Sequence, residues 1–165
     1  MGCGKTTVGR LLARQVGWHF VDLDSNIEER AGSTITAIFE RLGEPGFRDL
    51  EHEELVRVLG EAVERKKTIV VALGGGTITQ PRNMELLRAA GSLILWLDWP
   101  IETLLARCAT RKNRPLFRDE KSFRELFEIR RPFYEQADYH VACNAEPRQV
   151  VSQILALGIL ERVNA

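Results

Sequence analysis

The sequence lacks several features that would place the protein in a specialised class. Its formal net charge is zero, because 23 Lys and Arg residues balance 23 Asp and Glu residues, which gives no electrostatic case for binding nucleic acid or a membrane surface. No apolar run is long enough to span a bilayer. We expect no signal peptide, because Lys5 and Arg10 interrupt the start and no apolar segment of the required length follows. The sequence therefore predicts neither nucleic-acid nor membrane partners.

Cysteine is also scarce. Cys3, Cys108 and Cys143 have no metal-ligand spacing and an odd count, which is typical of reduced thiols in a cytoplasmic protein. Cys3 lies at the predicted start of a helix, where we expect its pKa to be lowered and its thiol to be oxidisable.

The sequence also lacks internal repeats and low-complexity linkers. We therefore expect the 165 residues to form a single domain, residues 1–165, and the protein to be a monomer.

What the sequence does contain is the end of a phosphate-binding loop. The full pattern is Gly, any four residues, then Gly-Lys-Ser/Thr, and Gly4-Lys5-Thr6 supplies its end. The first Gly of the pattern would fall two places before Met1. Glycines let backbone N–H groups close around a phosphate, and the following helix turns its positive end toward it. A glycine-rich tail before a helix is the alternative, but the amphipathic run that follows at once favours nucleotide binding.

Helical segments and short apolar runs alternate along the chain, which predicts an α/β fold with a largely parallel sheet. The predicted strands cover residues 18–24, 68–73, 92–97 and 139–143. The predicted helices run from the phosphate loop to Gly17 and then cover residues 25–43, 47–67, 81–90, 101–111, 122–137 and 147–163, with breaks at Gly32-Ser33 and at Pro132. Residues 44–46 are predicted to form a turn. The polar, basic segment of about residues 112–122 is predicted to be a mobile lid.

One part of this pattern is missing. A phosphate-binding loop connects a strand to a helix, yet no strand precedes Gly2. Such a strand commonly lies in the middle of the sheet, buried on both faces. We therefore expect Met1 to be an internal methionine, with the strand upstream of it.

Two carboxylates follow the second apolar run. Asp22 and Asp24 are two residues apart on a predicted strand, so both are expected to point to the same side. One could hold Mg²⁺ through water, and the other could accept a proton from a substrate hydroxyl. The alternative is that one ends the strand and the other caps the next helix, but the phosphate loop favours the functional interpretation. Asp98, after another apolar strand, is a rival metal ligand, but we favour a polar strand terminus there because it has no partner carboxylate.

The remaining candidate site residues are three consecutive glycines and three arginines that lie far apart in the sequence. Gly74-Gly75-Gly76 follows a buried strand and would let a ligand approach the backbone closely. Arg48, with Glu51 at i+3, could be part of a solvated ion pair. Arg114 on the predicted lid could neutralise charge on a transferred phosphoryl group or could be one more solvated cation. Arg130, beside a proline, could hold a carboxylate in bidentate fashion.

Taken together, these residues resemble the shikimate kinase family of P-loop kinases over nearly the whole chain, from Gly2 to about Pro147. The motifs that carry the resemblance stand in the family's order: Gly4-Lys5-Thr6-Thr7-Val8-Gly9, Asp22-Leu23-Asp24, Gly43-Glu44 with Phe47-Arg48 and Glu51, Leu73-Gly74-Gly75-Gly76, Arg114-Pro115-Leu116, and Arg130-Arg131-Pro132-Phe133-Tyr134 followed by Ala137-Asp138. The absent first loop Gly and preceding strand depart from the family. The resemblance implies a three-layer fold whose mostly parallel central sheet is flanked by helices, with a lid and a substrate-binding helical region at about residues 25–60.

The resemblance also implies the partners and the roles of residues. The partners would be ATP with Mg²⁺ and shikimate, which becomes shikimate 3-phosphate in aromatic amino-acid biosynthesis. The catalytic residues would be Lys5, Asp24 as the base, and Arg114. ATP would bind to Gly2, Cys3, Gly4, Lys5, Thr6, Thr7, Arg107, Arg114 and Pro147. Mg²⁺ would be held by Thr6 and Asp22. Shikimate would bind to Asp24, Arg48, Gly74, Gly75, Gly76 and Arg130.

Two other functions remain open on the sequence. A gluconate-type kinase would also be a P-loop kinase acting on a small carboxylated polyol, although the triple glycine and the Arg48/Arg130 pair speak against it. A non-catalytic nucleotide-binding domain would fit the incomplete phosphate loop. Against it, all the lysine, threonine, aspartate and arginine residues of the expected site are present.

Overall fold

Helices and short parallel strands alternate through the protein, as the apolar pattern predicts. The computed structural model describes residues 2–109 and 119–160. The helices are α1 (Lys5–Val16), α2 (Leu23–Ala31), α3 (Ile35–Glu64), the short 3₁₀ helix η1 (Thr77–Thr79), α4 (Pro81–Ala89), α5 (Ile101–Ala109), α6 (Glu120–Tyr134) and α7 (Pro147–Ala156). The strands are β1 (His19–Asp22), β2 (Ile69–Ala72), β3 (Leu95–Asp98) and β4 (Tyr139–Ala142). No described helix is both long and apolar enough to cross a membrane.

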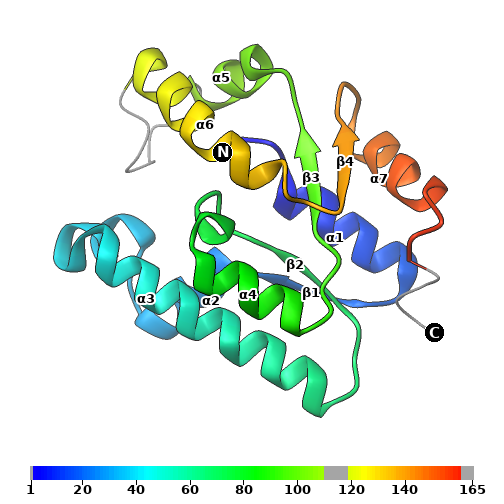
Figure 1. Cartoon of the computed structure of the whole chain (residues 1–165), viewed down its shortest axis with the longest axis horizontal. Helices are drawn as coiled ribbons and strands as arrows, with labels where there is room; N and C mark the ends of the chain where they lie inside the picture. Colours follow the sequence, from blue (N-terminus) through cyan, green and yellow to red (C-terminus); the bar gives the residue numbers. More distant parts are fainter. Residues whose placement is uncertain (1, 110–118, 161–165) are drawn as a thin grey trace.

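The four strands form two parallel pairs (Figure 1). β1 pairs with β2 in a register that places His19 opposite Ile69, and β3 pairs with β4 with Leu95 opposite Tyr139. The parallel direction that the sequence predicts is therefore confirmed. Among the described residues, no backbone ladder joins β2 to β3, so the two pairs remain separate sheets.

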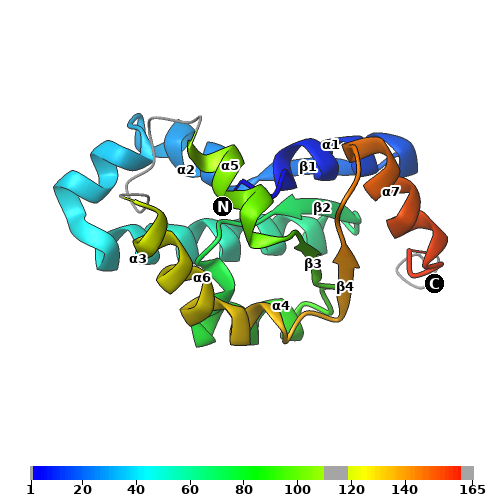
Figure 2. The same cartoon turned by 90° about the horizontal axis from the view of Figure 1, so that it is seen from above.

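Helices cover the strands on both sides (Figure 2), with α1 and α7 on one side and α4 on the other. The buried apolar side chains accordingly form two clusters. One joins α1 and α7 to β3, β4, α5 and α6, through residues such as Leu12, Leu97 and Ile154. The other joins α2, α3 and α4 to β1, through residues such as Ile27 and Leu55. Burial of each such side chain contributes about 1.5–3 kcal/mol to folding.

The predicted strand at residues 18–24 is too long. β1 ends at Asp22, and Leu23 already begins α2. The Asp22 carboxylate accepts a hydrogen bond of 3.3 Å from the backbone N–H of Ser25, as a helix N-cap does. The prediction that Asp22 and Asp24 share one face of a strand is therefore wrong, because Asp24 lies in the first turn of α2.

One predicted break between helices differs in form from the structure, and another is wrong. The turn at residues 44–46 does not form: the only non-helical residue in this part of α3 is Gly43, at φ 68°, where two helices join across a kink. Pro45 falls in the first turn after the kink, where its missing N–H costs little. α6 likewise continues through Pro132 to Tyr134. Of the predicted lid, residues 112–118 lie outside the described residues, and residues 120–122 begin α6.

Candidate active site

The phosphate loop, residues 2–7, leads directly into α1. Gly2 and Gly4 have positive φ angles of 70° and 81°, which glycine adopts without strain. α1 begins at Lys5, so the backbone N–H groups of its first turn, which have no carbonyl partner within the helix, lie at the end of this loop. A hydrogen bond joins the loop to the residue that follows β3: the Trp99 indole N–H donates to the Cys3 carbonyl at 3.0 Å. The arrangement is that of an anion-binding helix terminus.

Lys5 and Cys3 face each other across this loop. The Lys5 ammonium lies 3.6 Å from the Cys3 sulfur. The charge of that sulfur outweighs burial and, with Tyr134 and Asp24 nearby, raises the pKa of Lys5. Burial alone would raise the pKa of the Cys3 thiol, but the Lys5 charge and its hydrogen bonds lower that pKa overall. The direction expected for Cys3 is therefore confirmed, with Lys5 as a main cause.

Thr6 and Asp22 supply adjacent oxygens. The Thr6 hydroxyl donates a hydrogen bond of 2.6 Å to the Asp22 carboxylate, so the two side chains that were expected to hold a metal do meet. The described residues contain no cluster of three or more His, Cys, Asp or Glu that could hold a metal alone. One hydroxyl and one carboxylate fit Mg²⁺, which typically takes few protein oxygens and completes its shell with phosphate and water.

Asp24 lies between the phosphate loop and the glycine segment. Burial raises the pKa of its carboxyl group; the Lys5 charge opposes this shift, and the carboxylates of Glu51, Asp22 and Glu28 add to it. A Cβ placed on Gly74 would lie 3.1 Å from the Asp24 carboxylate and 2.6 Å from that of Glu51. Only a glycine fits between these two acids, which gives a physical reason for the first glycine of the triplet.

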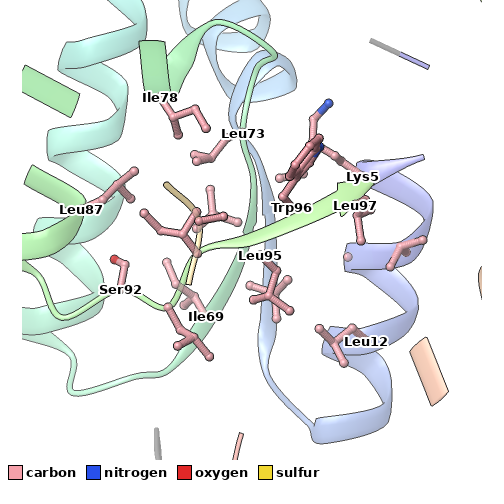
Figure 3. Close-up of a pocket in the computed structure, with 18 of the residues that line it drawn as sticks. Lys5, Leu12, Ile69, Leu73, Ile78, Leu87, Ser92, Leu95, Trp96 and Leu97 are labelled. Carbon is pink, nitrogen blue, oxygen red and sulfur yellow. The ribbon is translucent and has the colours of Figure 1, made fainter. Parts of the chain in front are cut away.

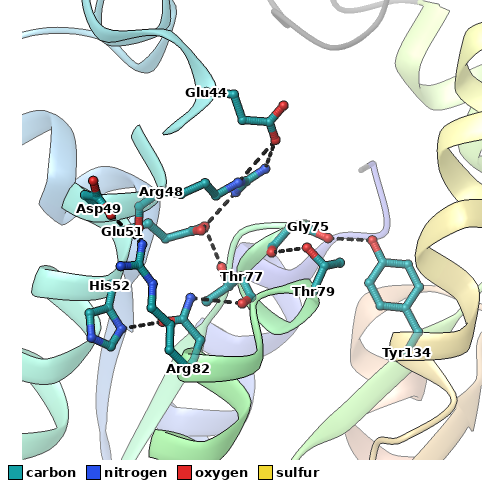
Figure 4. A network of polar contacts seen from close by, with 12 residues as sticks. Glu44, Arg48, Asp49, Glu51, His52, Gly75, Thr77, Thr79, Arg82 and Tyr134 are labelled. Carbon is teal, nitrogen blue, oxygen red and sulfur yellow. Dashed lines mark hydrogen bonds and ion pairs between the residues drawn. The ribbon is translucent and has the colours of Figure 1, made fainter. Parts of the chain in front are cut away.

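Arg48 is the centre of a polar group that we call the acid-side network, made of Glu44, Arg48, Glu51, His52, Thr77 and Asn83. Figure 4 labels all of its members except Asn83. The guanidinium, 8% exposed, donates hydrogen bonds of 2.8 Å to Glu44 and 2.9 Å to the fully buried Glu51. Burial would lower the pKa of Arg48, but the charge of Glu51 and the bonds to both acids raise it. The pair with Glu51, which the sequence left open as a solvated ion pair, is thus a buried one. Gly76 lies against the same guanidinium, so a Cβ there would collide with it.

The network continues from α3 into η1 and α4. The Thr77 hydroxyl donates to Glu51 at 2.6 Å, and the Asn83 amide donates to the Thr77 carbonyl at 3.0 Å. His52 pairs with the Asn83 side-chain oxygen at 2.7 Å. Each buried polar group therefore has a partner, which holds Arg48 and the glycine segment in one arrangement.

α6 contributes Arg130 and Tyr134. The Tyr134 hydroxyl donates a hydrogen bond of 2.7 Å to the Gly75 carbonyl, which joins α6 to the glycine segment (Figure 4). Burial raises the pKa of this hydroxyl, while the nearby charges of Arg130 and Lys5 oppose the shift. Arg130 is buried, and no carboxylate of the described residues forms a salt bridge with it. Its guanidinium thus differs from that of Arg48, which holds two acids.

The remaining predicted residues stand apart. The Arg107 guanidinium lies over the Trp99 ring, 3.8 Å from its centre. Pro147 is the first residue of α7. Arg114 lies outside the described residues. The structure thus brings together Lys5 and Asp24 with the glycine segment, Arg48 and Arg130.

Several site residues were missed on the sequence. Thr77 and Asn83 join the network through contacts that only the folded chain creates. Glu44 and Tyr134 were noted as parts of motifs without a role, and Trp99 was not singled out. A polar residue directly after the triple glycine was the one available signal for Thr77.

Comparison with known proteins gives a consistent result. The family model described as "Shikimate kinase" matches residues 1–157. A shikimate kinase of Persephonella marina is 43% identical over 94% of this chain and 92% of its own length. One from Acinetobacter baumannii is 44% identical over 95% of this chain and 87% of its own.

Solved structures agree with this. The shikimate kinase from Acinetobacter baumannii in complex with shikimate matches with a TM-score of 0.88 and 40% identity, over 98% of this chain and 89% of that one. The enzyme from Aquifex aeolicus matches with a TM-score of 0.80 and 33% identity, over 100% and 95% of the two chains. The three-layer α/β kinase fold is confirmed, and the gluconate-type kinase and the non-catalytic domain are not favoured.

Proposed function

We propose specific roles for the site residues of this chain, which belongs to the shikimate kinase family and catalyses the ATP-dependent phosphorylation of shikimate. Shikimate is a small carboxylated alcohol, so its site needs a cation for the carboxylate and a base beside the reacting hydroxyl. The observation that carries the assignment is the position of Asp24: its carboxylate lies beside Gly74, in the field of Lys5, between the phosphate loop and the acid-side network.

Arg48 and Arg130 bind the substrate carboxylate in this proposal. Arg48 is held in place by Glu44 and Glu51, and the buried Arg130 guanidinium can take a carboxylate in bidentate fashion. Gly74, Gly75 and Gly76 contribute backbone to the pocket, and the two buried acids and the guanidinium explain why side chains are excluded at Gly74 and Gly76.

Asp24 acts as the general base. The reacting hydroxyl oxygen forms a bond to the γ-phosphorus, the bond to the bridging oxygen of ADP breaks, and the hydroxyl proton passes to Asp24. A raised pKa suits this role, because a base is most effective when its pKa is closer to the working pH. Positioning and charge neutralisation provide most of the catalysis.

The phosphate loop, Gly2 to Thr7, binds the ATP phosphates, with Lys5 at the transferred group. Thr6 and Asp22 hold Mg²⁺, which supplies positive charge for the phosphate oxygens when it is bound. In this proposal Arg114 of the predicted lid contacts the phosphates, and Arg107 and Pro147 flank the adenine. We extend the proposal to one monomeric domain over residues 1–165, with a substrate-binding region at about 25–60. The three free thiols support a cytoplasmic location.

The test is a steady-state assay of ADP release with Mg-ATP and shikimate, with gluconate and no acceptor as controls. Asp24→Asn should lower kcat by about 10²–10⁴-fold while ATP still binds. Arg130→Ala should mainly raise the KM for shikimate, and Arg130→Lys should recover only part of the loss because a point charge replaces a planar fork. An unchanged kcat in Asp24→Asn, or an unchanged KM in Arg130→Ala, contradicts the respective role.

A further inference from the structure

The backbone of the glycine segment, Gly74 to Gly76, is held by hydrogen bonds to its carbonyl groups. The Gly74 carbonyl accepts from the Thr77 N–H at 3.3 Å. The Gly76 carbonyl accepts from the Thr79 N–H at 3.1 Å and from the Thr79 hydroxyl at 2.7 Å. These bonds close within three residues and belong to the turn that forms η1, so they hold only the two ends of the segment.

The middle carbonyl is held from a distant part of the chain. The Gly75 carbonyl accepts a hydrogen bond of 2.7 Å from the hydroxyl of Tyr134, which lies 59 residues away at the end of α6 (Figure 4). A trans peptide places its C=O and its N–H on opposite sides. Because the Gly75 carbonyl points to Tyr134, the N–H of Gly76, which belongs to the same peptide group, points away from it.

The N–H of Gly76 has no acceptor within residues 2–109 and 119–160. The Arg48 guanidinium lies so close to this glycine that a Cβ on Gly76 would collide with it. A backbone N–H and a guanidinium are both donors, and an anion placed between them would accept from both. The carboxylate of the substrate is the anion that Arg48 binds in the proposed function.

Tyr134 is itself held in place by packing. Its ring contacts the Trp96 ring of β3, with the ring centres 5.9 Å apart, and both side chains line one cavity, in which Figure 3 labels Trp96. The residues just after α6 are joined to the chain before β3: the Asp138 N–H donates to the Ile94 carbonyl at 2.9 Å, and the Ile94 N–H donates to the Asp138 carboxylate at 2.7 Å. The hydroxyl therefore has a fixed position from which it orients the glycine segment.

A peptide group between two glycines needs such a contact. Glycine adopts most backbone angles at little cost, so the peptide between Gly75 and Gly76 can rotate when nothing holds its carbonyl. Rotation would turn the carbonyl oxygen toward Arg48 and the N–H away from it. The oxygen would then repel an incoming carboxylate, and the hydrogen bond from Tyr134 disfavours that arrangement.

We propose that Tyr134 is a positioning residue of the substrate site: its hydroxyl holds the Gly75–Gly76 peptide so that the Gly76 N–H donates to the substrate carboxylate beside Arg48. The inference rests on the proposed function, in which Arg48 and Arg130 bind that carboxylate. Arg130 lies four residues before Tyr134, on the same face of α6. This helix therefore contributes a cation and orients a backbone donor for one anion.

The first test removes the hydroxyl alone, in Tyr134→Phe. We expect the KM for shikimate to rise about tenfold, with kcat within about twofold of the wild type and the KM for ATP unchanged, because the lost bond serves substrate binding. Tyr139→Phe is the matched control, since Tyr139 is the other tyrosine of the chain and its hydroxyl forms no hydrogen bond in the described part. An unchanged KM for shikimate in Tyr134→Phe, or equal effects on both substrates, contradicts the proposal.

The second test removes the charge from the substrate. With the methyl ester of shikimate as the acceptor, Tyr134→Phe and the wild type should have the same KM, because the carboxylate that receives the Gly76 N–H is gone. A merely structural role of the hydroxyl predicts the same rise in KM with the acid and with the ester. That result would overturn the proposal.

Nuclear magnetic resonance of protein labelled with ¹⁵N-glycine observes the Gly76 N–H directly. Saturating shikimate should move its proton resonance downfield in the wild type and in Tyr139→Phe, as a hydrogen bond to a carboxylate does, but not in Tyr134→Phe. No response in the wild type contradicts the contact. A response that persists in Tyr134→Phe means that the hydroxyl does not act through this peptide, and it also overturns the proposal.

Failure of this inference can be told apart from failure of the proposed function. An unchanged KM for shikimate in Arg130→Ala contradicts the carboxylate site itself. A raised KM in Arg130→Ala together with an unchanged KM in Tyr134→Phe leaves that site in place and contradicts only the role of Tyr134.

Discussion

The acid-side network and the phosphate loop are held in contrasting ways. The network joins α3, η1 and α4 through buried hydrogen bonds that run from Arg48 to Glu51 and Thr77. The phosphate loop is held, within the described residues, by the bond from Trp99 to the Cys3 carbonyl, the bond from the Thr6 hydroxyl to Asp22, and the Lys5–Cys3 contact.

This difference follows from what each region binds. A cation that must receive a carboxylate in a buried site needs fixed acids around it, since an unpaired buried charge is costly. A helix terminus already carries free N–H groups and needs only a glycine-rich approach. The acid side should therefore matter for folding as well as for binding, and the phosphate side mainly for binding.

The largest expected effect tests this contrast directly. Arg48→Ala leaves the fully buried Glu51 without its cation, so we expect the free energy of unfolding to fall by about 3–5 kcal/mol. Lys5→Met keeps the apolar stem and removes the contact with Cys3 and a positive charge near Asp24, so we expect a change of about 1 kcal/mol. Urea unfolding followed by circular dichroism measures both.

The control is the double variant Arg48→Met with Glu51→Gln, which removes both charges and retains an acceptor for Thr77. It should recover most of the stability lost in Arg48→Ala. Equal losses in Arg48→Ala and Lys5→Met, or no recovery in the double variant, would remove the contrast between the two regions.

The same contrast explains which parts of the site could be predicted. The phosphate loop is a local pattern, so Gly4, Lys5 and Thr6 could be found from their spacing alone. The acid-side network joins residues far apart in the sequence, such as Glu51 and Thr77, and its bonds depend on how α3 packs against η1. Sequence spacing could suggest Arg48 and Glu51 as a pair but not their burial.

Element types were predicted better than their ends. The parallel strands and most helices follow from apolar periodicity, whereas Asp22 ended β1 early by capping α2, and Gly43, not Pro45, kinked α3. These outcomes depend on single hydrogen bonds and backbone angles that periodicity does not encode.

A smaller effect concerns Asp24, which lies between the two regions. Its pKa is raised in the folded state, mainly by burial, so the folded protein holds this proton more tightly than the unfolded chain. The Asp24 carboxyl group therefore adds stability to the fold at low pH. This stability is lost as the pH rises from the pKa of the group in the unfolded chain through its pKa in the folded protein. At neutral pH the buried carboxylate therefore destabilises the fold.

We accordingly expect Asp24→Asn to have a higher Tm than the wild type at pH 7. Near pH 4 we expect the difference in Tm between the two proteins to be smaller or of opposite sign. Asp22→Ala is the matched control, because it should lose the helix cap and the Thr6 contact without this gain. Thermal unfolding at both pH values measures the effect. A lower Tm of Asp24→Asn at pH 7 would contradict a destabilising carboxylate.

The smallest effect concerns the thiol in the phosphate loop. The Lys5 charge lowers the pKa of Cys3, whereas burial raises that of Cys143 to about 12 and Cys108 is fully buried. Iodoacetamide should therefore modify Cys3 first, with a pH midpoint below the value of about 8.5 for a free thiol. Mass spectrometry of the digested protein measures the rate at each cysteine.

Two comparisons connect this reactivity to the loop. Lys5→Met should shift the midpoint of Cys3 labelling to higher pH, because the charge that stabilises the thiolate is gone. Mg-ATP should slow labelling of Cys3 in the wild type, since the nucleotide covers the loop, while Cys143 is unaffected. If Cys3 reacts no faster than free cysteine and ATP gives no protection, the thiol is not part of the phosphate-binding surface.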